Sequence, residues 1–514
     1  MVLEVLQGHN FNREIEEFFS CRNVLSILFS PLFFIFNKLS RVFGKKQNLP
    51  PSPPRLPIIG NFHQLGLLPH RSLRDLSQKY GPLMHIHLGN VPFLVVSSAE
   101  MAREILSTQD VVFAYRPFVT MAKGTCFGGT NLGFAPYGEY WRQATKICVN
   151  ELLSITKVQS FKSLREEEVS IMMEKIVESY KKGTIIDVGD LVLAMANSLI
   201  CKLVLGRTYH DNDSKLRNLI REVVVLFGKF SLRDFVPLLG WIDVITGLAK
   251  KMKRPAKELG DFLDKIIQDH LTTRMDEDVL DQQDFMDIML NTEKDSKLNI
   301  HFTRGEITAI ILDMLVAGTD TTATTVEWAM AELIKNSNKM MKVQEEVRRV
   351  MAKKSKVEED DIYQLEYMHC VIKESLRLHP PSPLLVPREA SFETIIEGYN
   401  IPPRTRVFIN VWAIHRDSKH WSNPQEFIPE RFLNSPIDFL GHDYEYLPFG
   451  AGQRGCPGIS FGMASTKLIL ANLLYWFNWE LPENTKKEDM DMTEAPGTAL
   501  HKKIPLHLLP KSSF

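Results

Sequence analysis

Phe449-Gly-Ala-Gly-Gln-Arg-Gly-Cys456-Pro-Gly458 is the most specific motif in this chain of 514 residues. Its glycines allow backbone turns that other residues resist, so the motif predicts a tight loop that presents Cys456. Backbone N–H groups in such a loop can stabilise the negative charge of a thiolate. The apolar run from Ile459 onward predicts a helix behind the cysteine, and a helix amino terminus also favours an anion. We therefore interpret Cys456 as a functional thiolate; the alternative is an inert buried cysteine.

The composition of the chain is that of a globular protein with a large core. Hydrophobic residues make up 44% and charged residues 24%, which excludes a mainly disordered or collagen-like chain. Lys plus Arg number 61 and Asp plus Glu number 62, so the net charge is −1. Because nucleic-acid binding requires a basic surface, we expect no nucleic-acid partner. The six cysteines contain no CxxC pair, which is typical of neither a disulfide framework nor a zinc site.

Residues 24–36, VLSILFSPLFFIF, form the only long apolar run. As a helix this run is about 20 Å long, shorter than a bilayer core of roughly 30 Å, but its extension back to Phe18 reaches that length. Basic residues follow the run and acidic residues precede it, which places the rest of the chain on the cytosolic side. We therefore expect a leader and membrane anchor with a basic flank over residues 1–47. A buried core helix is the alternative, and a cleaved signal peptide is disfavoured by the charge order.

A proline-rich hinge is expected over residues 48–60. Prolines lack the backbone N–H and restrict the residue before them, so this segment predicts a stiff extended spacer rather than a helix. Residues 61–514 contain no clear linker and no internal repeat. We expect them to form one large domain that is mainly helical with a small β portion.

Three parts of this domain have clear local patterns. Residues 83–98 alternate around Gly89-Asn90 and predict a β-hairpin. Residues 307–334 predict a long helix, and Thr303 before Glu306 predicts the capping box at its start. Residues 393–411 predict short strands, because glycine and proline interrupt them.

With its F-x-x-G-x-R-x-C-x-G motif, the chain resembles the cytochrome P-450 family of haem-thiolate monooxygenases over essentially its whole length. It is most similar to the microsomal enzymes of plant specialised metabolism. The resemblance implies the cytochrome P-450 fold, with residues 61–514 as the catalytic haem domain and haem b (iron protoporphyrin IX) as cofactor. It also implies that Cys456 is the axial ligand of the iron, that Phe449 packs near this ligand, and that Arg454 pairs with a haem propionate.

A second motif, Ala317-Gly-Thr-Asp-Thr-Thr322, lies inside the expected long helix. Glycine and β-branched threonine are poor helix formers, and threonine hydroxyls can bond preceding carbonyls and bend a helix. We therefore expect a loosened turn with room for water and dioxygen. Asp320 and Thr321 resemble the acid–alcohol pair of the family, which implies that they deliver protons during oxygen activation. A kinked core helix with a solvated Asp320 is the alternative.

The third motif is Glu374-Ser-Leu-Arg377, whose charged side chains can pair because they lie three residues apart on an expected helix. With Pro429-Glu-Arg431-Phe432 it resembles the Glu–Arg–Arg network of the family. The resemblance implies a structural role for Glu374, Arg377 and Arg431 on the haem side of the fold. A buried charged pair needs all of its partners, so the removal of one should be costly.

The fourth motif, Trp141-Arg-Gln-Ala-Thr145-Lys146, departs from the family pattern at one position. The family often has an arginine four residues after this tryptophan, where it reaches a haem propionate. Here Thr145 occupies that position, so the propionate contact from this helix is left open. Trp141 can still donate its indole N–H, and the resemblance implies Arg388 as a further propionate contact beside Arg454.

The substrate-facing stretches of the family fall here at residues 113–130, on the long helix, at 381–387 and at 496–500. Apolar and small residues dominate these stretches, which predicts a dry pocket for a neutral lipophilic molecule. Terpenoids, alkaloids and coumarins all fit, and ordinary core packing is the alternative for each single residue. The candidate pocket residues are Phe118, Val316, Ala317, Val386 and Thr498.

No GxGxxG motif follows an expected strand, so the chain contains no flavin or nicotinamide site and its electrons must come from a separate protein. The resemblance implies NADPH–cytochrome P-450 reductase as partner and the endoplasmic reticulum membrane as location, with the catalytic domain facing the cytosol. The predicted function is a monooxygenase that hydroxylates, epoxidises or oxidatively cyclises a lipophilic plant metabolite. Two alternatives are an oxygen-independent haem-thiolate dehydratase or isomerase, such as an aldoxime dehydratase, and a non-enzymatic haem carrier or sensor.

Overall fold

The computed structural model describes residues 48–125, 128–206, 219–223, 226, 231–276, 285–292, 301–352, 354, 356–483, 485–497 and 499–512. The chain divides into two compact units, one of residues 1–49 with 397–400 and one of residues 50–396 with 401–514. All described site residues belong to the second unit. The expected anchor over residues 1–47 lies outside the described residues.

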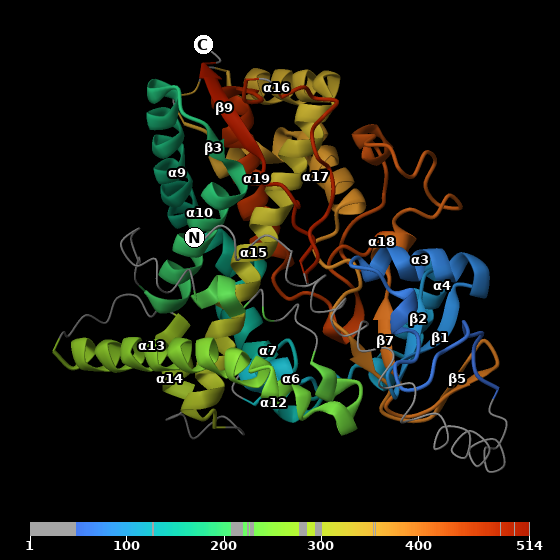
Figure 1. The fold of residues 1–514 in the computed structure, drawn as a ribbon. Coiled ribbons are helices and arrows are strands. Elements are labelled where there is room, and N and C mark those ends of the chain that lie inside the picture. The colour runs from blue at the N-terminus through green and yellow to red at the C-terminus, as the bar shows by residue number, and fades with distance from the viewer. Residues whose placement is uncertain are drawn as a thin grey trace, which may run out of the picture. The chain divides into compact units, whose positions relative to one another are not determined.

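Helices make up most of the second unit (Figure 1). Their bounds are α3 (Pro69–Tyr80), α4 (Ala99–Arg103), α5 (Asp110–Phe113), α6 (Thr120–Thr125), α7 (Glu139–Cys148), α8 (Ile155–Ser160), α9 (Lys162–Lys182), α10 (Val188–Leu205), α12 (Ile242–Ile245), α13 (Leu248–Asp276), α14 (Phe285–Thr292), α15 (Arg304–Lys335), α16 (Ser337–Met351), α17 (Glu366–Leu378), α18 (Val411–Ile414) and α19 (Ile459–Trp476). The expected mainly helical fold class is therefore confirmed.

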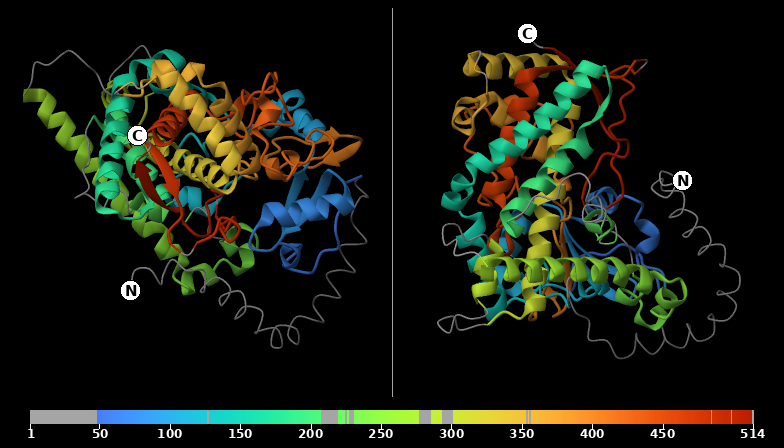
Figure 2. Two further views of the ribbon diagram at one scale, coloured as in Figure 1. Left: turned by 90° about the horizontal axis from the view of Figure 1, so that it is seen from above. Right: turned by 90° about the vertical axis from the view of Figure 1, so that its left-hand side faces the viewer.

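The long helix α15 runs through the middle of the helical part (Figures 1 and 2). The predicted capping box starts it: the backbone N–H of Thr303 donates to the carboxylate of Glu306 at 2.8 Å. Most of its residues are buried against α10, α17 and α19. Among the described helices, α10 and α15 are long and apolar enough to cross a membrane, but 61% and 67% of their most apolar windows are buried inside the protein. We therefore regard both as core helices.

A four-stranded sheet lies beside α3 (Figure 1). Its order is β1 (Leu83–Leu88), β2 (Val91–Val96), β7 (Arg406–Ile409) and β4 (Arg388–Glu389). Strands β1 and β2 are antiparallel, with Leu88 opposite Val91, which confirms the predicted hairpin. Strand β7 is parallel to β2 and antiparallel to β4. The sheet thus joins the hairpin near the start of the domain to the segment that carries Arg388.

The other described strands are short. A three-stranded sheet has the order β3 (Ile186–Asp187), β9 (His507–Ser512) and β8 (Phe477–Glu480). Strands β5 (Thr394–Ile396) and β6 (Tyr399–Ile401) fall, with β7, inside the range 393–411 where the sequence predicted strands. The small β portion is therefore confirmed as well. The main hydrophobic core surrounds α15, α10 and α19, and a separate small core lies under the hairpin.

Candidate active site

Cys456 lies in a tight loop between η8 (Gly452–Arg454) and the first turn of α19. Gly452 has a φ of +69°, and a Cβ there would lie 2.3 Å from the carbonyl oxygen of Leu106, so only glycine fits. The backbone N–H of Cys456 donates to the carbonyl of Phe449 at 3.0 Å and closes the loop. The loop and the helix behind it are therefore as the motif predicted.

Cys456 is an exposed residue, whereas the other described cysteines, 148, 201 and 370, are buried. Protein atoms nevertheless surround it closely: burial raises the pKa of the Cys456 thiol, and the backbone N–H of Gly458 opposes this rise only in part. Conversion to a thiolate there requires a nearby positive charge, such as a bound metal ion.

The middle of α15 has an exposed face although most of the helix is buried. Ala317 and Thr321, one turn apart, are both exposed. Gly318 lies between them and permits close packing, because a Cβ there would lie 3.0 Å from Ile200 and 3.9 Å from the ring of Phe461. Since Phe461 belongs to the first turn of α19, the exposed part of α15 lies close to the helix that begins behind Cys456.

The turn of α15 at residues 317–322 is not loosened as the sequence predicted. The helix continues without interruption from Arg304 to Lys335. The hydroxyls of Thr319, Thr321 and Thr322 donate to the carbonyls four residues earlier, at 2.6, 2.8 and 3.2 Å. These bonds occupy the hydroxyls without displacing the backbone bonds. The exposed face of the helix at this turn is instead that of Ala317 and Thr321.

Asp320 has a partner that the sequence did not reveal. Its carboxylate Oδ2 lies 3.1 Å from Nε2 of His501, which belongs to the segment before β9. The other ring nitrogen of His501, Nδ1, lies 3.0 Å from the hydroxyl of Thr324 on α15. The aspartate adjoins the exposed Thr321, so α15 carries an acid and an alcohol side by side and the imidazole of His501 contacts the acid from another segment.

Three buried or half-buried arginines, Arg116, Arg388 and Arg454, gather near the cysteine loop. Burial is the main cause that lowers the pKa of all three guanidinium groups. Repulsion between the arginines lowers the pKa of Arg116 and Arg454 further, and the pKa of Arg454 falls to about 9. Each is still charged at neutral pH. Arg116 donates to the backbone carbonyls of Gly133, Val386 and Pro387. Arg388 donates to Oδ1 of Asp110 and to the carbonyl of Ala451. Arg454 donates to the carbonyls of Ala114, Leu132 and Ala135. Among the described residues, Asp110 is the one carboxylate bonded to this cluster.

Trp141 supports the cluster from α7. Its indole N–H donates to the carbonyl of Leu132 at 3.0 Å, and the guanidinium of Arg454 lies 4.2 Å from the centre of its ring. The hydroxyl of Thr145, one turn later, is buried and has no hydrogen-bond partner among the described residues. The sequence did not predict Arg116 as a site residue. Position 145 lacks the arginine that the family often has there, and Arg116 is the third cation of the cluster with Arg388 and Arg454.

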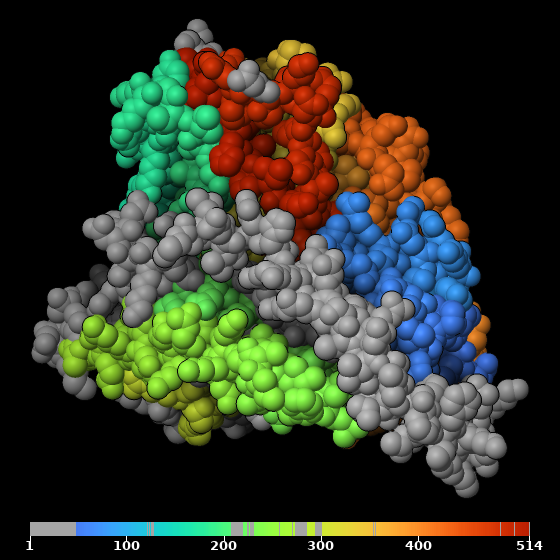
Figure 3. Space-filling view, in the orientation of Figure 1, coloured from blue at the N-terminus to red at the C-terminus, as the bar shows by residue number. Residues whose placement is uncertain are grey.

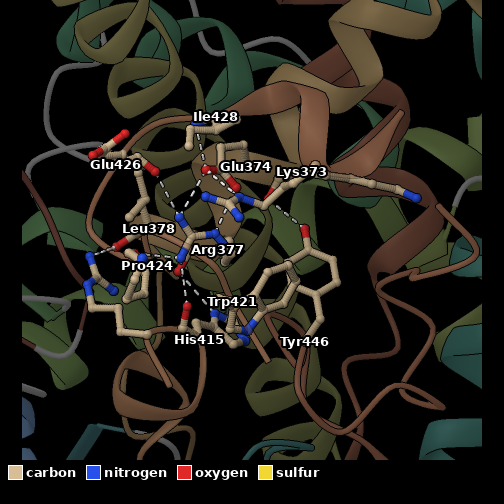
Figure 4. A network of polar contacts seen from close by, with 12 residues as sticks. Lys373, Glu374, Arg377, Leu378, His415, Trp421, Pro424, Glu426, Ile428 and Tyr446 are labelled. Atoms are coloured by element: carbon tan, nitrogen blue, oxygen red, sulfur yellow. Dashed lines mark hydrogen bonds and ion pairs between the residues drawn. The ribbon is translucent and has the colours of Figure 1, made fainter. Parts of the chain in front are cut away.

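Glu374, Arg377 and Arg431 meet in a buried network (Figure 4). The guanidinium of Arg377 donates twice to the carboxylate of Glu374, at 2.7 and 2.9 Å, and Arg431 donates to the same carboxylate at 3.0 Å. Arg377 also donates to three backbone carbonyls in the segment that precedes the cysteine loop, those of His415, Pro424 and Glu426. The network therefore ties α17 to that segment.

We expect Glu374→Gln to lower the free energy of unfolding by about 3–5 kcal/mol, because it leaves the guanidinium of Arg377 buried without its carboxylate. Thermal or denaturant unfolding of the cofactor-loaded protein measures this change. Glu426→Gln is the matched control: the Glu426 side chain is exposed and only its backbone carbonyl binds Arg377, so its effect should stay within about 0.5 kcal/mol. Equal stability of the two variants would contradict the structural role of this network.

The predicted substrate-facing stretches are joined by hydrogen bonds. Arg116 connects residues 113–130 to 381–387 through the carbonyls of Val386 and Pro387. The backbone N–H of Leu500 donates to the carbonyl of Pro381, and the indole N–H of Trp328 on α15 donates to the carbonyl of Leu500.

The five candidate pocket residues differ in exposure. Phe118 and Val386 are exposed by 63% and 37%, and Ala317 lies on the exposed face of α15. Val316 is partly buried and packs against the main core, and its place in the pocket stays a prediction. Thr498 lies outside the described residues.

Residues 50–509 match the family model of cytochrome P-450. The chain belongs to the cytochrome P-450 family. This P-450 is accordingly a monooxygenase that uses haem iron, as the sequence motifs predicted. Its fold is shared with a solved zebra fish cytochrome P-450 in complex with abiraterone, at a TM-score of 0.73 and 24% identity, over 87% of this chain and 100% of that chain.

Curated relatives of this P-450 come from plants. It is 52% identical to cytochrome P-450 71A1 of Persea americana, over 88% of this chain and 91% of the relative. It is 47% identical to desmethylyatein synthase of Sinopodophyllum hexandrum, over 96% of this chain and 99% of the relative. It is also 47% identical to phenylacetaldehyde oxime monooxygenase of Prunus mume, over 91% and 90%. The similarity to plant P-450 enzymes of specialised metabolism is therefore confirmed.

The residues near Cys456 of this P-450 fit a haem. Haem b offers an iron that binds a thiolate and two propionates that bind cations. Cys456 is an exposed residue, and a bound iron would supply the positive charge that stabilises its thiolate. The cluster of Arg116, Arg388 and Arg454 contains three cations against the single carboxylate of Asp110, an excess of two positive charges for the two propionates.

Proposed function

We propose that this P-450 oxidises a neutral lipophilic plant metabolite, such as a terpenoid, an alkaloid or a coumarin, with electrons from NADPH–cytochrome P-450 reductase. The reaction is a hydroxylation, an epoxidation or an oxidative ring closure. The observation that carries this proposal is the exposed pair Ala317 and Thr321 on the otherwise buried α15, close to the helix behind Cys456. Both side chains are small, which suits a lipophilic molecule placed against this face of α15.

In this proposal Cys456 ligates the haem iron, and Arg388 and Arg454, assisted by Arg116, neutralise the propionates. Phe449, which packs edge-on against Phe439 at 5.7 Å between ring centres, shields the ligand side. Trp141 acts through Arg454, because its own indole N–H is bonded to Leu132. When bound, the haem supplies the iron at which dioxygen is activated, and thiolate ligation favours cleavage of the O–O bond.

Asp320 and Thr321 are assigned the transfer of protons in this proposal. The hydroxyl of Thr321 is on the exposed face of α15 and can turn from the Ala317 carbonyl, 2.8 Å away, toward a water or a reacting oxygen. The carboxylate of Asp320 adjoins it and can take protons from water. Phe118, Val386 and Ala317 line the substrate side.

The name of one relative supports the substrate class. The phenylacetaldehyde oxime monooxygenase of Prunus mume is named for an aromatic small molecule. The stretches expected to face substrate in this chain contain few charged side chains. Both points favour a lipophilic aromatic or terpenoid molecule over a charged one.

A location on the endoplasmic reticulum membrane, with the domain facing the cytosol, completes the proposal. The apolar run over residues 24–36 and its basic flank support an anchor there. The segment around α12, bright green in Figure 3, lies on the surface and exposes Trp241, Val244 and Ile245. Such a group of exposed apolar side chains is typical of a surface that contacts lipid.

A panel experiment tests the proposed function. Membranes that contain this P-450 and a plant reductase are incubated with terpenoids, alkaloids, coumarins and aromatic oximes, and products are identified by mass. We expect at least one product that gains an oxygen atom or loses hydrogen, formed only with both NADPH and oxygen. A dehydrated or rearranged product formed without either would instead assign the chain to the oxygen-independent dehydratases or isomerases. Substrate-induced spectral shifts without any product would favour a carrier or sensor.

A further inference from the structure

His501 is the one described titratable group that the structure bonds to the side chain of Asp320. Nε2 of its imidazole lies 3.1 Å from Oδ2 of the carboxylate, and Nδ1 lies 3.0 Å from Oγ1 of Thr324. Both ring nitrogens therefore have an oxygen within hydrogen-bond distance. The Thr324 hydroxyl can accept from Nδ1 or donate to it, so that contact fits either form of the ring, whereas the carboxylate of Asp320 favours the charged form.

The backbone around His501 holds the ring against α15. Its N–H donates to the carbonyl of Ala499 at 3.0 Å, and its carbonyl accepts from the N–H of Ala495 at 2.8 Å. The neighbouring carbonyl of Leu500 accepts from Trp328 on α15. These bonds fix the segment to the same helix that carries Asp320. The backbone of His501 therefore keeps its imidazole close to the carboxylate.

The charged groups around the ring favour its protonation. Burial by itself lowers the pKa of His501, but the hydrogen bond and charge of Asp320, with a smaller contribution from Glu327, raise the pKa above its ordinary value of about 6.5. Arg221 opposes this rise. Of these three charged groups, two are carboxylates and one is a cation.

We propose that His501 is the positioning residue of Asp320: as an imidazolium it holds the carboxylate at a fixed place on α15, and loss of its proton to water loosens that hold. The inference rests on the proposed role of Asp320 in proton delivery. A charge-assisted hydrogen bond is roughly twice as strong as one between neutral partners, so deprotonation of the ring weakens the contact without breaking the fold.

The pH dependence follows from the raised pKa. The ion pair is fully formed below pH 6.5, where the ring is charged in the folded protein, and is lost as the pH rises through the raised pKa. The window in which Asp320 is released therefore lies above pH 6.5. An arginine at position 501 stays charged, so Asp320 would be held over the whole pH range. A glutamine there is neutral, so Asp320 would be held loosely at every pH.

Hydrogen–deuterium exchange at the imidazole carbon, followed by peptide mass spectrometry, tests the contact in the haem-loaded enzyme without a substrate. We expect the exchange midpoint of His501 to lie above pH 6.5 and to fall by about one unit or more in Asp320→Asn, since an opposite charge at this distance shifts a pKa by that amount. The exposed His507 on β9 is the internal control and should keep its midpoint. An unchanged His501 midpoint in Asp320→Asn would overturn the inference.

The rate of NADPH consumption gives the second measurement, with a substrate found in the panel experiment. We expect the rate of the wild type to fall as the pH rises above 6.5, that of His501→Gln to be low and independent of pH, and that of His501→Arg to be high and independent of pH. The loss in His501→Gln should be smaller than the roughly 10²–10⁴-fold cost of a proton-transfer group itself. His507→Gln should behave as wild type.

The two proposals fail in different ways. A panel without any oxygenated product contradicts the proposed function, whereas the exchange measurement still decides whether His501 holds Asp320. A pH step that survives in His501→Gln, together with an oxygenated product, contradicts the positioning role while the monooxygenase function stands.

Discussion

Cys456→Ser should abolish the shifted absorption band that the reduced, carbon-monoxide-treated enzyme shows when a thiolate ligates its haem. Serine has nearly the shape of cysteine, but its hydroxyl does not ionise in the tight loop of residues 449–458 and cannot replace a thiolate. The expected loss is therefore complete in the difference spectrum, and product formation should stop with it. The measurement needs no substrate, so it tests the ligand independently of the panel.

Cys370→Ser is the matched control for this result. The thiol of Cys370 is buried on α17, and burial raises its pKa to about 11, so it is an uncharged core group. Its replacement should lower stability somewhat but retain the band. Retention of the band in Cys456→Ser, with its loss in a variant of another cysteine, would show that the ligand is assigned to the wrong residue.

Thr321→Ala should separate electron consumption from product formation. The hydroxyl of Thr321 lies on the exposed face of α15, and its loss removes a donor that can stabilise a protonated oxygen. We expect haem and substrate to bind almost normally and NADPH consumption to continue. Product should fall and hydrogen peroxide should rise, because oxygen is reduced without its productive protonation. Thr319→Ala is the control, since that hydroxyl is buried and donates to the carbonyl of Leu315.

Asp320→Asn should slow the whole cycle by about 10²–10⁴-fold, the usual cost of losing a positioned proton-transfer group. Stopped-flow reduction and steady-state NADPH consumption measure it. The two variants should differ in what they change. Loss of the acid that relays protons lowers the rate of every turnover, whereas loss of the alcohol lowers the product formed per NADPH. Unchanged product per NADPH in Thr321→Ala, or an unaltered rate in Asp320→Asn, would refute the proposed roles.

Much of the fold could be predicted because its strongest patterns are local. The capping box at Thr303 and Glu306, the turn at Gly89-Asn90 and the glycines around Cys456 each act within a few residues of chain. The helix after Cys456 is visible as an apolar run for the same reason. In each case the structure has the element where the sequence predicted it.

One expectation about the site was changed by packing. The turn at residues 317–322 was expected to loosen, but the threonine hydroxyls bond to carbonyls of their own helix and the surrounding helices hold it intact. A sequence pattern shows which residues weaken a helix, but not how strongly its neighbours hold it.

The sequence by itself determined the class of chemistry, because a cysteine in a glycine-rich loop and an acid–alcohol pair in a long helix are each encoded within ten residues. Only the tertiary structure decided which partners surround these groups. Thr324 and His501 are separated by 177 positions, and Asp110 and Arg388 by 278, so no local pattern connects them. The cluster of Arg116, Arg388 and Arg454, and the imidazole that meets Asp320, exist because separate segments are packed against one another; long-range contacts of this kind depend on the whole core.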